Sequence, residues 1–276
     1  MVALTRADPT TSPCSGPANA RYPLRAGEAT SVAELDRLVV GCKACPRLVA
    51  WREEVAVVKR AAFADQTYWA RPAPGFGDPG AAILVVGLAP AAHGANRTGR
   101  MFTGDRSGDF LFAALHRAGL ASQPTSSGRD DGMTLTGVRL TAPVHCAPPA
   151  NAPTPAERHT CGPWLGRELE LVAPDVAVVL GAFGWQALVA TLAERDWRVP
   201  RPRPRFAHGA EVRLSGPDGR ELVLLGCFHV SQQNTFTGRL TPPMLDAVLA
   251  RARELAAPQL SALPRSAPRA GVRPDG

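Results

Sequence analysis

The chain has 276 residues, of which 45% are hydrophobic and 20% are charged, and this length fits one large domain or at most two small ones. A globular chain of this size builds a core without disulfides, and no apolar run reaches the ~18 residues of a membrane span. The first residues lack the apolar stretch of a secretory signal, so we expect a soluble protein in the cytoplasm. The net charge of +7 favours a polyanionic partner such as nucleic acid, although an arginine-rich surface without such a partner remains an alternative.

Three regions follow from composition along the chain. Residues 1–29 mix Pro, Ser, Thr, Gly and Ala without periodicity, which predicts a disordered leader. Residues 258–276 alternate Pro, Ala and Arg, which predicts a disordered basic tail. We therefore expect residues 30–257 to form a single domain, within which no internal repeat is visible.

Helices and strands are expected to alternate within this domain. Capping boxes at Ser31–Glu34 and Thr154–Glu157 mark two helix starts, and apolar runs closed by glycine are typical of buried strands. Helices are predicted from residue 31 and over residues 107–120, 155–172, 185–194 and 242–255. Strands are predicted over residues 82–86, 138–144 and 175–181. Two further strands are joined at residues 215–219, and the second of them covers residues 222–227. This order predicts an α/β fold, a mainly parallel central sheet flanked by helices, with ligands at the carboxyl ends of the strands.

Four of the six cysteines are placed where they could share one metal centre. Cys42 and Cys45 lie within one turn of each other, Cys146 follows a predicted strand, and Cys161 comes 15 residues later. A cytosolic protein does not keep structural disulfides, so this concentration indicates a metal site. Four thiolates suit zinc as well as iron, and four ordinary buried thiols are a further alternative. The spacing alone does not name the metal.

Polar residues gather after three predicted strands. A glycine-punctuated loop from Gly87 leads to Asp105 at a helix start, Asn151 stands between prolines after the next strand, and His229 follows the last strand. Strand ends are where ligand-reading and catalytic groups collect. A helix-capping aspartate, a turn asparagine and a structural histidine are the alternatives. No P-loop or dinucleotide fingerprint is present, so we expect no nucleotide cofactor.

Taken together, these motifs resemble the uracil-DNA glycosylase superfamily, specifically its iron–sulfur branch called family five (type B). The resemblance covers residues 42–255, and the order and spacing of the motifs make it specific. The motifs are Cys42-x-x-Cys45-Pro-Arg-Leu, Gly87-Leu-Ala-Pro-Ala-Ala-His-Gly, Phe102-Thr-Gly-Asp105, Cys146-Ala-Pro-Pro-x-Asn151, Cys161 and His229-Val-Ser-x-Gln-Asn-Thr-x-Thr-Gly-Arg-Leu240.

The resemblance implies a monofunctional hydrolase that flips a deaminated base out of DNA and cleaves its N-glycosidic bond, in base excision repair. It implies double- and single-stranded DNA as substrate, a monomeric enzyme, and a place beside the nucleoid of a bacterial cell. It also implies a structural [4Fe–4S] cluster. Its four ligands would be Cys42, Cys45, Cys146 and Cys161.

The resemblance also assigns a role to single residues. Phe102 would stack on the flipped base and Asn151 would read its Watson–Crick edge, within a pocket that includes Gly87. His229 would stabilise the charge that develops on uracil O2, and Asp105 would hold the attacking water. The loop over residues 231–237 would enter the minor groove, with Gln232 and Gln233 filling the vacated space.

Two positions depart from the best-known uracil glycosylases. Ala89 stands where those enzymes carry a catalytic aspartate, and Ala91 stands where they carry an aromatic guard against the methyl group of thymine. Because residue 89 has no carboxylate, we expect Asp105 to supply the catalytic carboxylate. Ala89 then forms part of the wall of the base-binding pocket. The second predicts a roomier pocket, so we expect excision of larger deaminated bases such as hypoxanthine as well as uracil.

Two other functions compete with this interpretation. A non-catalytic module that binds DNA through the same fold and metal cluster would keep the motifs but release no base. An enzyme that acts on free nucleosides would cleave deoxyuridine and ignore duplex DNA. Three polar groups at three strand ends favour catalysis, and the basic charge balance favours a polymer.

Overall fold

The computed structural model describes residues 21–257 and Leu260, and a mixed sheet of six strands in the order β1-β3-β2-β4-β6-β5 forms its centre. The four inner strands are parallel, and β1 and β5 pair antiparallel at the two edges. The strands are β1 Phe76–Gly77, β2 Ile83–Val86, β3 Val138–Thr141, β4 Val176–Leu180, β5 Glu211–Ser215 and β6 Glu221–Cys227. The predicted α/β fold with a mainly parallel sheet is confirmed.

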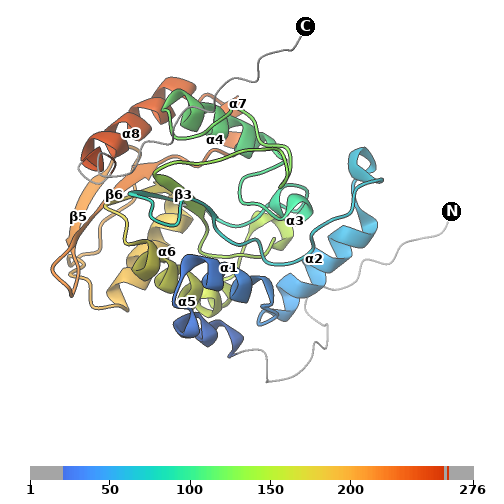
Figure 1. Ribbon diagram of the computed structural model, residues 1–276, viewed down its shortest axis with the longest axis horizontal. Coiled ribbons are helices and arrows are strands. Elements are labelled where there is room, and N and C mark those ends of the chain that lie inside the picture. Colours follow the sequence, from blue (N-terminus) through green and yellow to red (C-terminus); the bar gives the residue numbers. More distant parts are fainter. Residues whose placement is uncertain (1–20, 258–259, 261–276) are drawn as a thin grey trace, which may run out of the picture.

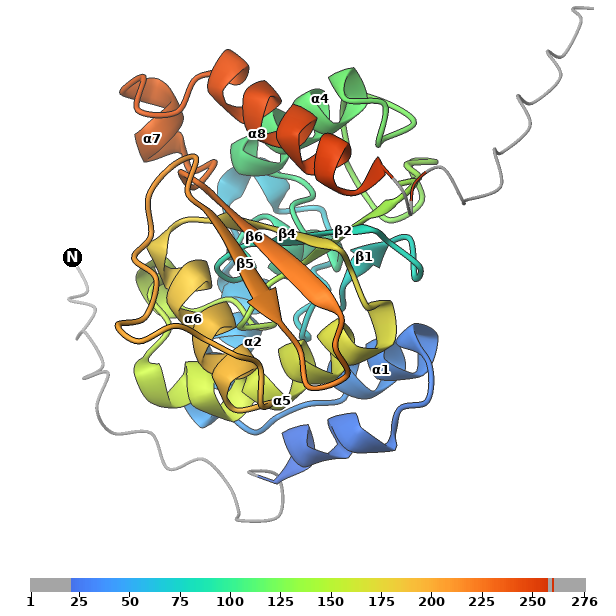
Figure 2. The same cartoon turned by 90° about the vertical axis from the view of Figure 1, so that its left-hand side faces the viewer.

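Helices cover both faces of this sheet, with α4 and α8 on one side and α5 and α6 on the other (Figures 1 and 2). The remaining helices lie at the sheet edges and in the connections. The α-helices are α1 Val32–Val40, α2 Pro46–Val58, α3 Ala95–Thr98, α4 Arg106–Arg117, α5 Pro155–Val172, α6 Ala182–Ala193, α7 Gln232–Phe236 and α8 Pro242–Leu255, and the 3-10 helices are η1 Tyr22–Glu28, η2 Ala61–Phe63 and η3 Pro149–Asn151.

The inner strands β2 and β4 are apolar throughout because both of their faces are buried, whereas the inner strand β3 also carries the buried polar residues Arg139 and Thr141. In β2, Ile83 and Val85 pack into the core beneath α4 and α8, whereas Leu84 and Val86 pack into the core beneath α5 and α6. A strand covered on both faces shows an uninterrupted apolar run instead of alternation. Among the described residues, no helix has the length and hydropathy that crossing a membrane requires.

The predicted boundary of the disordered leader at residue 29 is wrong. Tyr22–Glu28 form the 3-10 helix η1, in which Ala26 is buried, and Ala29 O accepts a hydrogen bond from Arg167 Nη2 at 2.7 Å. Tertiary packing on α5 orders this polar, aperiodic segment. Residues 1–20 of the predicted leader, and the predicted tail except Leu260, lie outside the described residues.

Element boundaries differ from the prediction where tertiary contacts end. The strand predicted over 138–144 stops at Thr141, because its partner β2 turns away at Gly87 and leaves the next residues without a strand to pair with. The helix α2 was absent from the prediction, and Cys45 is its N-cap residue. The helix predicted over 155–172 has these bounds in the structure.

Candidate active site and cysteine centre

A pocket of about 630 Å³ lies at the carboxyl ends of β2, β3 and β6. Its wall comes from the segments that follow these strands, which is where parallel α/β sheets bind ligands. The volume falls in the ~300–1,000 Å³ range of small-molecule sites. Seven of the eight residues predicted for base binding and catalysis line this pocket: Ala89, Phe102, Asp105, Asn151, His229, Gln232 and Gln233.

The eighth residue, Gly87, packs against Phe102. A Cβ atom at residue 87 would lie 2.5 Å from Phe102 Cζ, so only glycine leaves room for the ring. Phe102 itself has a φ of 54°, a left-handed conformation that is uncommon for an aromatic residue. Such strain persists only where surrounding contacts enforce it. The fold therefore holds this aromatic ring in one place at the pocket wall.

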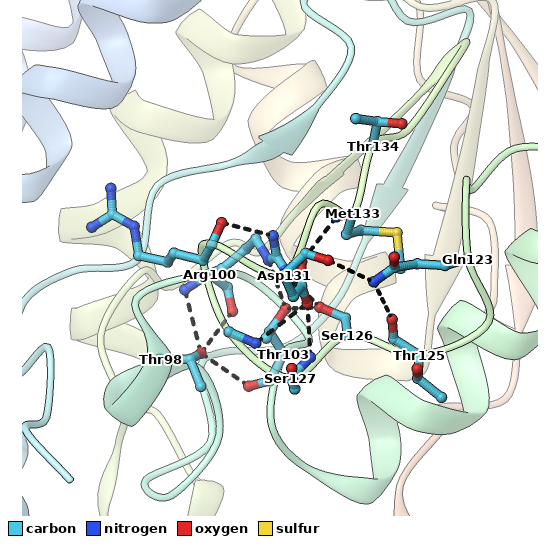
Figure 3. A network of polar contacts seen from close by, with 12 residues as sticks. Thr98, Arg100, Thr103, Gln123, Thr125, Ser126, Ser127, Asp131, Met133 and Thr134 are labelled. Carbon is cyan, nitrogen blue, oxygen red and sulfur yellow. Dashed lines mark hydrogen bonds and ion pairs between the residues drawn. The ribbon is translucent and has the colours of Figure 1, made fainter. Parts of the chain in front are cut away.

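A buried polar network enforces the conformation of the segment that carries Phe102 (Figure 3). Arg100 forms an ion pair with Asp131, and its Nη2 also donates to Ser126 Oγ at 2.6 Å. Ser126 Oγ lies 2.8 Å from Thr103 Oγ1, which accepts a further hydrogen bond from Arg100 Nε at 3.1 Å. These contacts flank Phe102 on both sides along the chain. Sequence reasoning missed them because the partners are separated by more than 20 residues.

Asp131 is the anionic centre of this network. Besides Arg100, it accepts hydrogen bonds from the backbone N–H groups of Ser127 at 2.8 Å and Met133 at 2.9 Å. Burial acts to raise the pKa of this carboxyl, but the hydrogen bonds from Arg100 and the backbone outweigh it and hold the pKa below its ordinary value. Asp131 therefore stays charged at every physiological pH, and the network stays formed.

Asp105 lies both at the start of a helix and at the wall of the pocket. It is the N-cap residue of α4, and its Oδ1 accepts a hydrogen bond from Gly108 N at 2.9 Å. Its Oδ2 faces Gly94, where any side chain would collide with it, and accepts no hydrogen bond from the described residues. Asp105 thus caps the helix, as the alternative interpretation expects. Its second carboxylate oxygen, Oδ2, stays available to a molecule in the pocket.

Asn151 presents its side chain from a tight turn after β3. Both Ala150 and Asn151 have positive φ values, 52° and 54°, within the 3-10 helix η3. Asparagine tolerates this conformation better than most residues. Its amide is exposed at the pocket and makes no hydrogen bond with the described residues, so both its donor and its acceptor are free for a base edge.

His229 lies half-buried just past the end of β6. Burial lowers the pKa of its imidazole to about 4, so the ring is neutral at pH 7 and carries one N–H donor. A Cβ atom at Gly181 would lie 3.2 Å from His229 Cβ, which makes the start of α6 a close wall behind the histidine. Asn234 Nδ2 donates to His229 O at 2.8 Å and fixes the backbone there. The prediction assigned no role to Asn234.

The segment predicted as a loop over residues 231–237 contains a helix. Gln232–Phe236 form α7, because hydrogen bonds such as Thr235 N to Ser231 O close a helical turn. Gln232 and Gln233 are exposed at the pocket rim, and Phe236 is also exposed. A short helix therefore presents the two glutamines.

The four cysteines predicted as metal ligands line one small buried cavity. Cys42 lies in the link between α1 and α2, Cys45 caps α2, Cys146 follows β3 and Cys161 is in α5. Cys227 is buried in the core of β6, apart from this group, as its strand position predicts. The sixth cysteine lies outside the described residues.

A buried arginine contacts two of these cysteines, at the Cys146 sulfur and the Cys42 carbonyl. Arg52 is 1% exposed, donates from Nη1 to Cys146 Sγ at 2.9 Å, and forms no ion pair with a described carboxylate. Its Nε has no hydrogen-bond partner. A buried cation without an anion is strongly unfavourable. Arg52 therefore fits a cavity whose cysteines are thiolates.

The thiols themselves need a metal to be charged. Burial raises the pKa of Cys146 to about 11 and that of Cys45 to about 12, so without a metal both stay protonated at neutral pH. Metal binding deprotonates its thiol ligands. Within the described part of the chain, no three His, Cys, Asp or Glu side chains converge closely enough for one metal ion. A four-iron cluster takes one thiolate at each iron, so its ligands stand around a larger group.

The fold and the site define an α/β protein with a pocket at the carboxyl ends of its parallel strands and a separate buried cavity lined by four cysteines. Residues 74–253 match the family model described as the uracil DNA glycosylase superfamily. The chain belongs to the uracil-DNA glycosylase superfamily, as the sequence motifs predict.

Curated relatives agree with this assignment. The chain is 57% identical over 233 residues to a protein named type-5 uracil-DNA glycosylase from Mycobacterium bovis, covering 84% of each chain. It is 56% identical over 232 residues to the protein of that name from Mycobacterium leprae, covering 83% of this chain and 98% of the other. The protein of that name from Thermus thermophilus is 54% identical over 220 residues, or 79% of this chain and 95% of the relative.

Proposed function

We propose that the protein hydrolyses the N-glycosidic bond between uracil and deoxyribose in DNA, as a monofunctional glycosylase of base excision repair. Asp105, Asn151 and His229 come from distant parts of the chain and line one pocket, and this observation carries the proposal. The similarity to proteins named type-5 uracil-DNA glycosylase supports it.

The base enters the pocket after the nucleotide rotates out of the helix. Phe102 stacks on the face of the base, and the free amide of Asn151 pairs with its edge. Gln232 and Gln233, exposed at the rim on α7, occupy the space that the base leaves in a duplex. Single-stranded DNA needs no such filling, so both forms are substrates.

In the chemical step, the bond between C1′ and N1 breaks and its electron pair leaves with uracil. The neutral His229 donates its N–H to uracil O2, where negative charge develops. Asp105 orients a water molecule through its free oxygen and stabilises the cationic sugar. The water oxygen bonds to C1′, and one proton of the water passes to the Asp105 carboxylate. The product on the DNA strand is an abasic site.

A duplex with a single uracil tests this activity. Incubation with the protein followed by alkali cuts the strand at each abasic product. Binding without scission would favour the non-catalytic DNA-binding module, and release of uracil from free deoxyuridine alone would favour a nucleoside hydrolase.

The pocket is expected to accept deaminated bases larger than uracil. Ala91, at the position of the aromatic guard in the best-known uracil glycosylases, lines the pocket with a single methyl group. We expect hypoxanthine to be excised at a measurable rate from a duplex that carries it. The release of each base is measured on a panel of duplexes that carry uracil, hypoxanthine, xanthine or thymine.

The control for this prediction is Ala91→Phe, which restores the bulk. This variant is expected to keep uracil excision and to lose hypoxanthine excision. Undetectable hypoxanthine and xanthine release by the unsubstituted protein, with efficient uracil release, would show that the pocket is narrow.

We also propose that Cys42, Cys45, Cys146 and Cys161 hold a structural [4Fe–4S] cluster. Their common cavity and the unpaired buried Arg52 support this, because a cluster with four thiolates supplies the missing negative charge. When bound, the cluster would tie together α1, α2, the segment after β3, and α5.

Loss of one ligand is expected to remove the iron. Cys146→Ala should lose visible absorbance and stoichiometric iron after anaerobic purification. Cys227→Ala is the control, since Cys227 is also buried but belongs to the core of β6. A colourless protein with stoichiometric zinc would contradict the cluster.

A further inference from the structure

The connection from α6 to β5 carries an unusual run of arginines, which we name the arginine strap and define as residues 198–208. Arg198, Arg201, Arg203 and Arg205 are all exposed, and prolines stand between the last three. None of these four forms an ion pair with a described carboxylate. Arg195 before the strap and Arg213 after it are both ion-paired. No described carboxylate therefore neutralises the positive charge of the strap.

The strap has an inner and an outer side. From residue 203 to residue 210, exposed residues alternate with half-buried ones, so Arg203 and Arg205 point outward while Phe206 and His208 point inward. An extended segment places alternate side chains on opposite sides. The outer side thus presents guanidinium groups.

The inner side is fastened to the body of the protein. Pro204 O accepts a hydrogen bond from Trp185 Nε1 at 2.8 Å, and the Phe206 ring lies 6.0 Å from that of Trp185. The His208 ring stacks on Phe228 at 4.9 Å, and Phe228 N donates to His208 Nδ1 at 3.2 Å. The arginines are therefore carried on a fixed backbone, which lowers the entropy lost on binding.

The contact between His208 and Phe228 places one end of the strap beside the pocket. Phe228, on which His208 stacks, immediately precedes His229 of the pocket wall. Figure 2 shows the segment in light orange, running along α6 toward the end of the molecule that carries α7. The strap leads away from the pocket rim along the outside of the sheet edge.

We propose that the arginine strap binds the phosphate backbone of the DNA duplex that flanks the nucleotide in the pocket. The proposal rests on the proposed DNA glycosylase function and adds a second contact surface to it. Unpaired guanidinium groups suit phosphates, which position a protein on DNA without reading its sequence. The two aromatic rings of the strap, Phe206 and His208, both point inward, so the strap offers no platform on which bases could stack.

The test compares two triple variants. The first, R201Q/R203Q/R205Q, removes the charges of the strap nearest the pocket. The control, R25Q/R37Q/R253Q, removes three exposed arginines from η1, α1 and α8, none of which lines the pocket. The affinity of each for a duplex with a central tetrahydrofuran abasic site is measured from low to physiological salt.

Each lost phosphate contact lowers the slope of log Kd against log salt by about 0.9. The strap variant should therefore show a slope reduced by about 2 to 3, and the control a slope equal to that of the unsubstituted protein. The conservative variant R201K/R203K/R205K should restore the slope, which separates charge from folding. The strap variant should excise uracil in a single turnover, at saturating enzyme, at the rate of the unsubstituted protein.

A strap variant whose slope equals that of the control would overturn the proposal and indicate a solvated arginine surface or a protein partner. This failure is distinct from failure of the proposed function. If the unsubstituted protein released no uracil, the glycosylase activity would be rejected, while binding to the abasic duplex would still report on the strap.

Discussion

Asp105→Asn is expected to lower the single-turnover rate of uracil excision by about 10²–10⁴, the usual contribution of a positioned acid or base. The amide keeps the hydrogen bond from Gly108 N, because asparagine and aspartate cap helices about equally well. It loses the negative charge and the ability to accept a proton from water. The free energy of unfolding should therefore stay nearly constant while the chemical step slows.

Asp105→Ala is the companion variant, since it removes the cap and the charge together. We expect it to lose the same factor in rate and, in addition, about 1 kcal/mol of stability. Rapid-quench measurements at saturating enzyme, with urea unfolding of both variants, separate the two effects. A near-normal rate in Asp105→Asn with a defect in Asp105→Ala alone would make Asp105 a helix cap without a chemical role.

Features governed by neighbouring residues could be predicted from the sequence. The capping boxes predict the starts of α1 and α5, where Glu34 N donates to Ser31 Oγ at 3.3 Å and Glu157 N donates to Thr154 Oγ1 at 3.2 Å. The reciprocal bond to the N-cap N–H forms at α5, whereas the Glu34 carboxylate accepts from Thr30 N instead. The apolar runs predict β2 and β4 because double-sided burial leaves a continuous pattern. The pocket residues were predictable because polar residues follow three strands that run in parallel.

Features set by contacts between distant residues could not be predicted. Arg52 is a buried charged residue of α2 that contacts Cys146, so the helix lacks a clean apolar face and its periodicity is obscured. Arg100 gives no sequence signal of its partner Asp131, 31 residues away. The helix η1 is short and has no apolar periodicity, and its packing against α5 and α1 orders it.

His229→Ala is expected to lower the single-turnover rate by about 10²–10³, the cost of removing one donor to a developing oxyanion. Affinity for an abasic duplex should not change, since the imidazole is half-buried in the pocket rather than on the surface that meets phosphates. His116→Ala is the control, because it removes an imidazole of α4 that lies outside this pocket. Near-normal turnover in His229→Ala would remove His229 from the chemistry.

The pKa of His229 gives this residue a separate signature in stability. Its folded pKa of about 4 lies below the ordinary 6.5, so between these values the unfolded chain binds more protons than the folded one. The free energy of unfolding therefore falls as pH drops from 6.5 to 4, by at most ~1.4 kcal/mol per pH unit. His229→Gln lacks this contribution, so urea unfolding of the two proteins should diverge across this window. Parallel curves would mean that folding leaves the pKa of His229 at its ordinary value, and that burial does not hold the imidazole neutral.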